Sequence, residues 1–391
     1  MKKYDFNKTI NRKNTNCFKW DDLKSKFGRN DLIPMWVADM DFRAAKPLLD
    51  EFKKRCRHGV FGYSFHPESY YQSIINWMQH RHNWQIERNW IVNTPGIVPA
   101  LNFAIQSYTD PGDRILIQTP VYDPFFQGII SNGRKVVTSP LKIVLNHYEM
   151  DFVDLETKLK QDIKIMILCS PHNPVGRVWT RQELINLSEL CIKNNVILIA
   201  DEIHSDLIFS KYEHIPVASI SEDIGLRTIV LNAPSKTFNI AGLITAYAII
   251  PKAELRDKFN EFLTRNHLLM GNIFGNIALQ TVYERGESWL EQLLIYLEEN
   301  YEYLCDFFAN QTPKIKPLRM EGTYLAWLDF RDFELSNFEL EKLVIHKAKV
   351  GLNPGVQYGK NGSGFMRMNF GCPRSILKKA LARLKKTFIV Y

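Results

Sequence analysis

Val196-Ile-Leu-Ile-Ala-Asp-Glu202 is a short apolar run that ends in two acids, and runs of this kind decide the fold class. Four more such runs cover residues 114–119, 164–169, 228–232 and 244–250. Short continuous apolar runs are typical of strands that are buried on both faces. Before the run at 196 we expect a helix, because Thr180 and Glu183 match a capping box and Asn194-Asn195 can end the helix. This alternation predicts an α/β fold with a mainly parallel sheet.

The pattern changes after about residue 285. We expect a long amphipathic helix over 288–310, a strand over 323–329, a helix near 335–349 and a strand over 364–370. These elements predict a smaller α+β domain over 286–391, which the N-terminal arm over 1–50 helps to complete. The large domain is predicted over 51–285. Two domains agree with a length of 391 residues, which exceeds the usual size of a single core.

The composition is that of a globular protein, with 45% hydrophobic and 24% charged residues. No apolar run is long enough to span a membrane, and the charged N-terminus is not followed by the apolar core of a signal peptide. The six cysteines are scattered and form no Cys-x-x-Cys pair, which indicates reduced thiols and no metal site. We therefore expect a cytoplasmic protein without a membrane partner.

The net charge of +8 raises the question of nucleic-acid binding. Residues 1–30 hold nine lysines and arginines against three acids, so most of the excess lies in one N-terminal arm. No stripe of arginine and aromatic residues accompanies it, and we expect no nucleic-acid partner. The arm is predicted to be solvated or to lie on a partner subunit. A basic run at 377–386 has the spacing of an amphipathic surface helix.

Lys236, Asp201 and Asn173 each follow one of the apolar runs. In parallel sheets, ligands bind beyond the C-terminal ends of the strands, so we expect these three side chains at one edge of the sheet. A lysine can hold an aldehyde cofactor as an imine, and an acid can pair with the nitrogen of its ring. Asn173, held between two prolines, can donate to a phenolate oxygen. Together they predict a site for pyridoxal phosphate (PLP).

Each of these polar residues also has a structural interpretation. Asn173 can belong to a plain Pro/Asn turn. Asp201 can cap a following helix, and we expect that capping role for Glu202. His204 can contact the cofactor ring or fill a structural position.

Three further segments can complete the site. The backbone N–H groups of Gly96-Ile97-Val98, where a strand turns into a helix, can hold a phosphate. Tyr122 can stack on a flat ring, whereas Phe125 and Phe126 suit the core better. Arg367 lies within an apolar strand, where it predicts either a salt bridge to a substrate carboxylate or an internal ion pair.

The chain resembles the fold-type I PLP enzymes of the class I/II aminotransferase superfamily and, within it, the MalY/PatB-type cystathionine β-lyases. Eight segments carry the resemblance, in the family order and over nearly the whole chain. They are Pro34-Met-Trp-Val-Ala-Asp-Met-Asp-Phe42, Phe61-Gly-Tyr-Ser64, Pro95-Gly-Ile-Val-Pro-Ala-Leu101, Tyr122-Asp-Pro-Phe-Phe126, Pro171-His-Asn-Pro-Val-Gly-Arg-Val-Trp179, Asp201-Glu-Ile-His-Ser-Asp206, Ser235-Lys-Thr-Phe-Asn-Ile-Ala-Gly242 and Gly364-Phe-Met-Arg-Met-Asn-Phe-Gly-Cys-Pro-Arg374. The first segment is the most specific to the group.

The resemblance implies a role for each candidate residue. Lys236 would bind the PLP aldehyde, Asp201 would pair with the ring nitrogen, and Asn173 would bind the ring oxygen. Tyr122 and His204 would contact the ring. The phosphate would be held by Gly96, Ile97, Val98 and Ser235, with Tyr63 reaching in from the other subunit of a homodimer, and the substrate would be bound by Arg367, Asn173, Trp36 and Val37.

Two positions depart from the family pattern. Many members carry an arginine for the phosphate shortly beyond the lysine, where this chain has Gly242-Leu-Ile-Thr245. Many aminotransferases also carry a tyrosine where this chain has His204. The phosphate is therefore expected to depend more on neutral donors and on Tyr63.

The resemblance implies a C–S β-lyase that cleaves L-cystathionine or a related cysteine thioether to a thiol, pyruvate and ammonia. An aminotransferase acting on an L-amino acid would use the same residues, so the residues alone leave both activities open. A third interpretation is a regulatory protein that retains the fold. The presence of Lys236, Asp201, Asn173 and Arg367 argues against a dead site.

Overall fold

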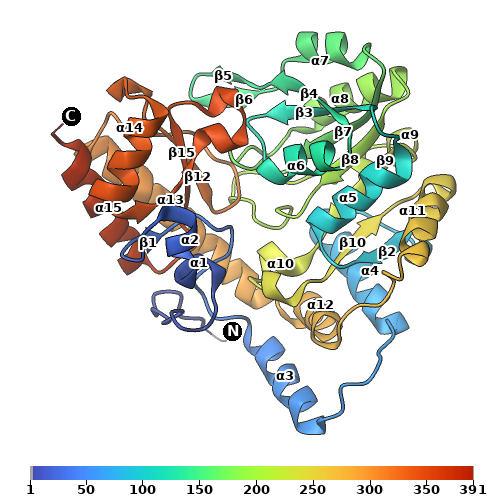
Figure 1. Cartoon of the computed structure of the whole chain (residues 1–391). Helices are drawn as coiled ribbons and strands as arrows, with labels where there is room; N and C mark the ends of the chain where they lie inside the picture. Colours follow the sequence, from blue (N-terminus) through green and yellow to red (C-terminus); the bar gives the residue numbers. More distant parts are fainter. Residues whose placement is uncertain (1–2, 391) are drawn as a thin grey trace.

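The computed structural model describes residues 3–390, and within them a seven-stranded sheet forms the centre of the molecule (Figure 1). Across the sheet the strands are β2 (Ile91–Thr94), β10 (Ala246–Ile249), β9 (Thr228–Asn232), β8 (Ile197–Asp201), β7 (Ile163–Cys169), β3 (Arg114–Thr119) and β4 (Lys135–Pro140). The five strands from β9 to β4 run parallel, and β10 runs antiparallel to both of its neighbours. The predicted α/β fold with a mainly parallel sheet is confirmed.

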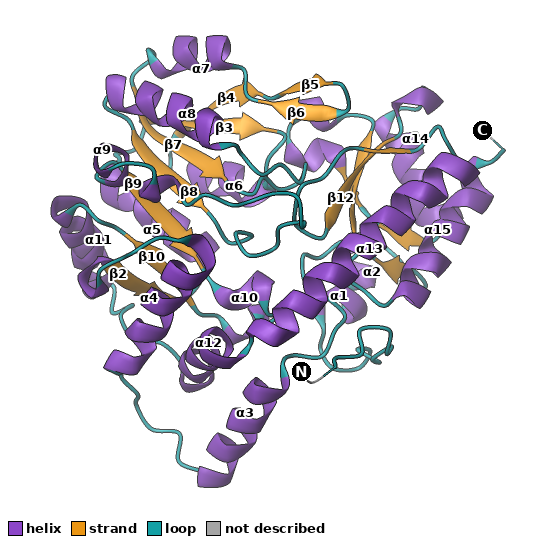
Figure 2. Cartoon of the chain, turned by 180° about the vertical axis from the view of Figure 1, so that it is seen from behind, coloured by secondary structure: helices purple, strands orange, loops and turns teal. Residues whose placement is uncertain are grey.

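Helices cover both faces of this sheet (Figure 2). On one face α5 (Ile97–Tyr108), α6 (Asp123–Ser131) and α11 (Ala253–Arg265) pack on strand residues such as Ile167 and Ile199. On the other face α4 (Glu68–His82), α7 (Phe152–Leu159), α8 (Arg181–Lys193) and α12 (Ile273–Arg285) pack on the alternate residues, such as Leu168 and Leu198. Because successive side chains of a strand point to opposite faces, the continuous apolar runs supply two cores at once.

The local signals that end the expected elements act as predicted in most places. The capping box of Thr180 and Glu183 opens α8, and Asn194 follows its last turn. The strand predicted from the apolar run at 244–250 is wrong for its first two residues, since β10 begins only at Ala246. Ile244 has a φ of +47° after the short 3-10 helix Ala241–Leu243 and is 60% exposed. A left-handed residue cannot continue the strand, so the apolar side chain stays at the surface.

A second, four-stranded sheet has the order β11-β12-β15-β14. Its strands are β11 (Lys316–Pro317), β12 (Leu325–Asp329), β15 (Phe365–Asn369) and β14 (Asn353–Pro354), and its helices include α13 (Glu287–Gln311) and the amphipathic α15 (Arg374–Phe388). The expected helix near 335–349 is split into α14 (Asn337–Lys342) and a π-helical turn (Leu343–Lys347). The boundaries near residues 50 and 285 stay a prediction.

The N-terminal segment lies on this second sheet. It forms α1 (Phe18–Asp21), α2 (Leu23–Phe27) and β1 (Ile33–Pro34), and β1 pairs in parallel with β13 (Val350–Gly351). The expectation of a solvated arm is wrong for Lys19, which is 1% exposed, and for Arg12, which is half-buried. Both cations pair with acids of the same chain, so they are not available to a distant partner.

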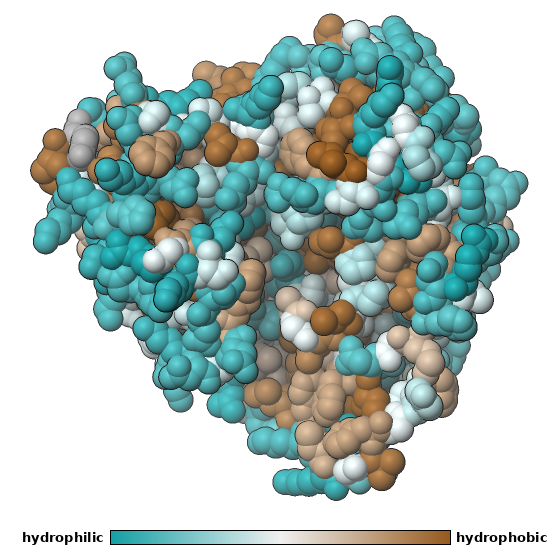
Figure 3. All heavy atoms as spheres, viewed as in Figure 1, coloured by the Kyte–Doolittle hydropathy of each residue, from teal (hydrophilic) through white to brown (hydrophobic). Residues whose placement is uncertain are grey.

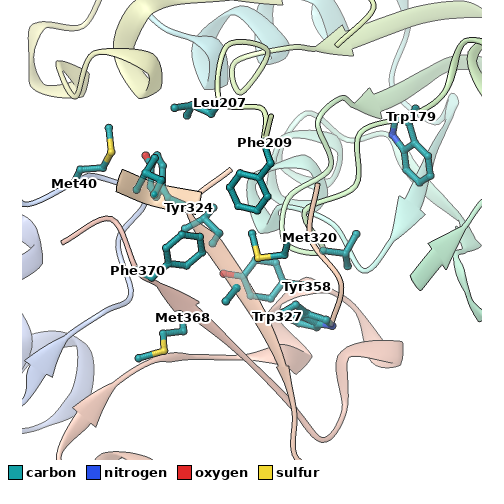
Figure 4. Close-up of a cluster of buried hydrophobic side chains, with 14 of the residues drawn as sticks. Met40, Trp179, Leu207, Phe209, Met320, Tyr324, Trp327, Tyr358, Met368 and Phe370 are labelled. Carbon is teal, nitrogen blue, oxygen red and sulfur yellow. The ribbon is translucent and has the colours of Figure 1, made fainter. Parts of the chain in front are cut away.

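The two sheets meet through a cluster of buried side chains (Figure 4). Leu207 and Phe209, which follow β8, lie against Tyr324 and Phe370 from the ends of β12 and β15. Backbone hydrogen bonds cross at the same place, from Phe209 to the Glu321 carbonyl and from Thr323 to the Leu207 carbonyl. This contact sets the position of the second sheet relative to the C-terminal ends of the central strands.

The capping role expected for Glu202 is wrong, because a turn and not a helix follows β8. Glu202 instead accepts hydrogen bonds from His214 and from the Val217 N–H in the core. All six cysteines are free. Among the helices of residues 3–390, none combines the length and the apolar character needed to cross a bilayer.

Candidate active site

A cavity of about 260 Å³ lies beyond the C-terminal ends of β7, β8 and β9. The ends of parallel strands are where ligands bind in such sheets. Nine of the predicted site residues line it: Lys236, Asp201, Asn173, Tyr122, Gly96, Ile97, Val98, Ser235 and His204. Arg367, Trp36, Val37 and Tyr63 are not among its lining residues.

Lys236 is held in α10 (Pro234–Thr237), a single turn that begins directly after β9. Its Nζ donates to the carbonyl of Ala38 at 2.7 Å. Burial lowers the pKa of Lys236 from 10.5 to about 8, against the opposing charge of Asp39. A substantial share of this amine is therefore neutral near physiological pH, which is the state that attacks an aldehyde or accepts a proton.

Asp201 is the last residue of β8, and its carboxylate is buried. It accepts one hydrogen bond, from the Ile203 N–H at 3.2 Å. Burial raises the pKa of Asp201 from 3.8 to about 7, and the charge of Lys236 opposes this only in part. A buried carboxylate of this kind needs a cation beside it to stay ionised. The protonated ring nitrogen of PLP fits that requirement.

Arg367 lies in the middle of β15, is 3% exposed, and forms no ion pair with a carboxylate of residues 3–390. Its guanidinium donates to Asn173 Oδ1 at 3.0 Å and to the Trp36 carbonyl at 2.7 Å, and it lies over the Tyr358 ring. Its Nε has no hydrogen-bond partner in the part of the chain that the structure describes. The internal ion pair that the sequence left open is therefore absent from the described chain. A buried guanidinium with only neutral partners suits a carboxylate ligand.

The contact with Arg367 also orients Asn173. Because Asn173 Oδ1 accepts from the guanidinium, its Nδ2 is the end left for the cavity. The backbone N–H of Asn173 donates to Cys169 Sγ at 3.3 Å. The Ser170–Pro171 and Asn173–Pro174 peptide bonds are both cis. The side chain thus has the donor that a phenolate oxygen of PLP would accept.

The opposite wall of the cavity offers neutral donors. Helix α5 starts after Gly96 without a side-chain cap, so the first N–H groups of the helix are free for an anion. The Ser235 hydroxyl also lines the cavity. Ile244 and Thr245 lie in the same wall, at the place where the sequence lacks an arginine. These donors fit the phosphate of PLP without a cationic side chain.

Two ring residues complete the lining. Tyr122 is the N-cap of α6, and burial raises its pKa to about 12, so it is a neutral aromatic face. His204 is buried, and burial together with the charges of Lys236 and Arg367 lowers its pKa to about 3. His204 is therefore a neutral imidazole, and its Nδ1 has no partner in the described chain.

Sequence reasoning missed the part that Ala38 plays. Its carbonyl accepts from both Lys236 and the Tyr324 hydroxyl, the latter at 2.8 Å. The segment 34–42 was recognised as characteristic, but a backbone acceptor leaves no mark in the residue type. Tyr324 stands at the start of an expected strand and gave no signal beyond that.

Tyr63 lies apart from the cavity and is 96% exposed. It belongs to the segment between α3 (Lys46–His58) and α4, which also exposes Val60, Phe61 and Phe65. Apolar atoms gather over this segment at the lower edge of the molecule (Figure 3). An exposed apolar group is a candidate surface for a protein contact.

Known proteins are similar to this chain over nearly its whole length. Residues 31–384 match the family of class I and II aminotransferases. The cystathionine β-lyase PatB of Bacillus subtilis is 42% identical over 97% of this chain and 99% of its own, and the protein MalY of Escherichia coli is 36% identical over 97% and 98%. The structure of cystalysin from Treponema denticola, which contains PLP, superposes with a TM-score of 0.96 at 38% identity over both full chains.

The chain belongs to the class I and II aminotransferase family and, within it, to the group that contains PatB and MalY. Its fold is the fold-type I architecture of the PLP-dependent enzymes.

Proposed function

We propose that this protein is a PLP-dependent C–S β-lyase that cleaves L-cystathionine or a related cysteine thioether. The proposal rests on one observation: Lys236, Asp201 and Asn173 line the same cavity. Beside it the Arg367 guanidinium, which has no carboxylate partner within residues 3–390, donates a hydrogen bond to Asn173. The name of PatB as a cystathionine β-lyase supports the choice of substrate.

PLP would be held by the residues that line the cavity. Lys236 would bind its aldehyde, Asp201 its ring nitrogen and Asn173 its ring oxygen. Tyr122 and His204 would contact the ring faces and edges as neutral groups. The phosphate would be bound by the N–H groups of Gly96, Ile97 and Val98 and by the Ser235 hydroxyl. When bound, PLP supplies an aldehyde carbon and a ring that accepts an electron pair from the substrate.

Arg367 would bind the substrate carboxylate, with the segment of Trp36 and Val37 beside it. Two N–H groups of a guanidinium match two carboxylate oxygens, which fixes the orientation of the amino acid. An amino acid held in this way would have its Cα–H bond available to the Lys236 amine. Neutral partners around Arg367 leave its charge available for this contact.

Lys236 would be the general base. Its pKa of about 8 provides the neutral amine that takes the proton from Cα. Asp201 would keep the ring nitrogen protonated, which favours the loss of that proton. The Cβ–S bond then breaks, and one water is consumed overall as thiol, pyruvate and ammonia leave.

An aminotransferase is the second candidate function, because the family that the chain matches is named for this activity. In that reaction Lys236 would return the proton to the cofactor carbon, and Arg367 and Asp201 would keep the same roles. The two activities differ in whether a 2-oxo acid is required.

A homodimer with a shared active site is part of the proposal. The exposed segment with Tyr63 and Phe65 would pack on the second copy, and the Tyr63 hydroxyl would reach the phosphate side of the partner's cavity. The wall there has Ile244 in place of a cation, so a donor from outside the chain has a function.

The test is to incubate purified protein with L-cystathionine, without a 2-oxo acid, and to measure pyruvate. Pyruvate over many turnovers is expected, and the Lys236→Ala variant should form none. Amino transfer that appears only when a 2-oxo acid is added would instead establish the second candidate. The absence of both reactions in a protein that binds PLP would favour a regulatory role.

A further inference from the structure

The N-terminal arm contains a buried cluster of charges that the proposed reaction does not use. Lys19 of α1 donates to Asp41 Oδ2 at 2.8 Å and to the Asp39 carbonyl at 3.2 Å. Arg12 donates to Asp41 Oδ1 at 2.7 Å and to both oxygens of Asp39. The Trp20 indole donates to the same Asp41 oxygen at 2.8 Å. Lys19 and Asp41 are 1% and 2% exposed.

Burial of such a pair has a cost that needs a reason. Replacing a buried ion pair with apolar side chains is often neutral or stabilising, so the cluster is weak evidence for stability alone. Asp41 accepts from Lys19, Arg12 and Trp20, and the charges of the cluster converge on one short segment, residues 36–41. The function of the cluster therefore depends on what this segment contacts.

The segment 36–41 has no regular secondary structure, yet two of its carbonyls contact the two cationic residues of the site. The Ala38 carbonyl accepts from Lys236 Nζ at 2.7 Å, and the Trp36 carbonyl accepts from Arg367 at 2.7 Å. No strand ladder fixes these carbonyls. Asn353 donates to the Trp36 carbonyl at 3.1 Å and Tyr324 to the Ala38 carbonyl at 2.8 Å. The only backbone bond of the segment to the second sheet's strand end runs from the Asp41 N–H to the Gly371 carbonyl within the described residues, so side chains provide most of the contacts that position it.

Side chains bind the segment 36–41 from two sides. On the inner side Asn239 bonds both the N–H and the carbonyl of Met40, and Asn369 bonds the carbonyl of Asp39. On the outer side Lys19 and Arg12 hold the two acids. The contact with α1 is reciprocal, because the Trp36 indole donates to the Lys19 carbonyl at 3.1 Å. The arm thus closes the outer side of the segment.

We propose that Lys19 and Asp41 are positioning residues of the active site. Through them the N-terminal arm fixes the Ala38 and Trp36 carbonyls, which set the spacing between the Lys236 amine and the Arg367 guanidinium. This inference rests on the proposed function of the cavity.

The test uses the PLP-loaded enzyme with Lys19→Met, which removes the charge and keeps the length of the side chain. We expect kcat/KM for L-cystathionine to fall roughly 10- to 100-fold, because small misplacements of catalytic groups have effects of this size. We also expect a shift in the pH midpoint of the visible absorbance of bound PLP and weaker competition by propionate. These two readouts report on Lys236 and on Arg367 separately.

Two variants serve as controls. Lys19→Arg keeps the cation and should restore most of kcat/KM and the pH midpoint. Lys24→Met removes an exposed lysine of the same arm and should behave as wild type. If Lys19→Met does not fold, Arg12→Gln weakens the same cluster and is judged by the same measurements.

A purely structural cluster gives a different result. Lys19→Met would then lower the thermal midpoint and leave kcat/KM, the pH midpoint of the absorbance and the propionate constant unchanged, which would overturn the proposal. If the wild type itself does not cleave cystathionine, the proposed function fails. The absorbance and propionate measurements would still decide whether Lys19 positions the two site residues.

Discussion

At the scale of single residues, Asp201 and Arg367 are buried ionisable groups of opposite sign, and neither forms an ion pair within residues 3–390. Asp201 has one backbone donor, and Arg367 has two neutral acceptors and an unpartnered Nε. Natural sequences pair their buried charges unless a function requires otherwise. In the proposed function the two residues would bind the two charged ends of one ligand complex, a cationic ring and an anionic substrate.

Replacing Arg367 with alanine tests one end. Loss of a buried contact to a charged group costs roughly 2–4 kcal/mol, so kcat/KM for L-cystathionine should fall roughly 30- to 1,000-fold. The matched control is an analogue of cystathionine that lacks the carboxylate of its cysteine half, because it has no α-carboxylate for the guanidinium to bind at the cleaved end. Wild type and Arg367→Ala should act on that analogue equally poorly. Equal losses on both substrates would mean that Arg367 only supports the fold.

The pKa of Lys236 gives a pH dependence. Since burial lowers this pKa to about 8, half of the Lys236 amine of the apoprotein is neutral at that pH, and the neutral fraction nears its limit about one unit higher. The rate at which apoprotein takes up PLP should therefore rise with pH, pass its midpoint near 8 and level off above about 9. Stopped-flow absorbance between about pH 6 and pH 10 measures it. A rate that still climbs at the upper limit would indicate an ordinary lysine.

The sequence predicted the polar residues of the cavity well, because strand ends can be read from apolar runs. Lys236, Asp201 and Asn173 each follow such a run and lie together as expected. It could not predict the Ala38 carbonyl, since the contact joins residues 198 positions apart through a backbone atom. The capping role predicted for Glu202 was wrong for a related reason. A turn follows β8, and the partner of Glu202 in the core is His214, which lies in a later loop.

At the scale of elements, the loop from Ser170 to Arg177 is tied to the second sheet at two points. Asn173 accepts from Arg367, and Arg177 donates to Glu321 at 3.2 Å. Arg177 also holds both oxygens of Glu183 at 2.6 Å. Glu321 further accepts from the Val178 N–H at 2.8 Å. Several hydrogen bonds to buried ion pairs make this loop a firm connection between the two sheets.

Glu321→Gln should weaken that connection. Partners of Glu321, above all His147 and Arg177, hold its pKa below 4.5 against the effect of burial. A depressed pKa in the folded state contributes stability above the ordinary value, and this stability is lost as the pH falls through the folded pKa. The variant should lose about 1–3 kcal/mol of unfolding free energy at pH 7. Its difference from wild type should shrink below about pH 4.5.

Thermal midpoints across this pH range measure the effect. Glu254→Gln is the matched control, because Glu254 pairs with Lys252 at the surface. An exposed pair contributes little, so that variant should stay close to wild type at every pH. A Glu321→Gln difference that does not change with pH would show that hydrogen bonding, and not charge, holds the loop.

Elements themselves were predictable where one local signal acted alone. The capping box fixed the start of α8, and amphipathic spacing fixed α13 and α15. β10 shows the limit, because its apolar run includes Ile244, and only the left-handed turn at that residue sets where the strand begins. Its antiparallel direction depends on pairing with both β2 and β9, which no local pattern encodes.

At the scale of the whole molecule, the segment after α3 gives the single chain an incomplete surface. Tyr63 and Phe65 are 96% and 80% exposed, and Ile244 at the rim of the cavity is exposed as well. Soluble proteins rarely leave aromatic side chains this exposed without a partner. A symmetric dimer would cover them with the same surface of a second copy. The sequence indicated this arrangement only through its resemblance to a family, since one chain cannot encode its partner's position by pattern.

A hybrid dimer tests whether Tyr63 completes the partner's cavity. One chain carries Lys236→Ala and the other Tyr63→Ala, each with its own tag for purification. If each site combines Lys236 of one chain with Tyr63 of the other, one site of the hybrid has both residues intact, and the other site has neither. The hybrid should recover about half of the wild-type activity, although the Lys236→Ala dimer is inactive and the Tyr63→Ala dimer is impaired roughly 10-fold or more by the lost phosphate contact.

If Tyr63 acts within its own chain, the same hybrid has no intact site. Its activity would then not exceed half that of the Tyr63→Ala dimer. A Tyr63→Ala dimer with full activity and normal PLP affinity would remove Tyr63 from the site altogether. Tyr63→Phe separates the hydroxyl from the ring, because it keeps the apolar contact area and should lose only PLP affinity. Recovery in the hybrid therefore identifies the second copy as the source of the donor that Ile244 does not provide.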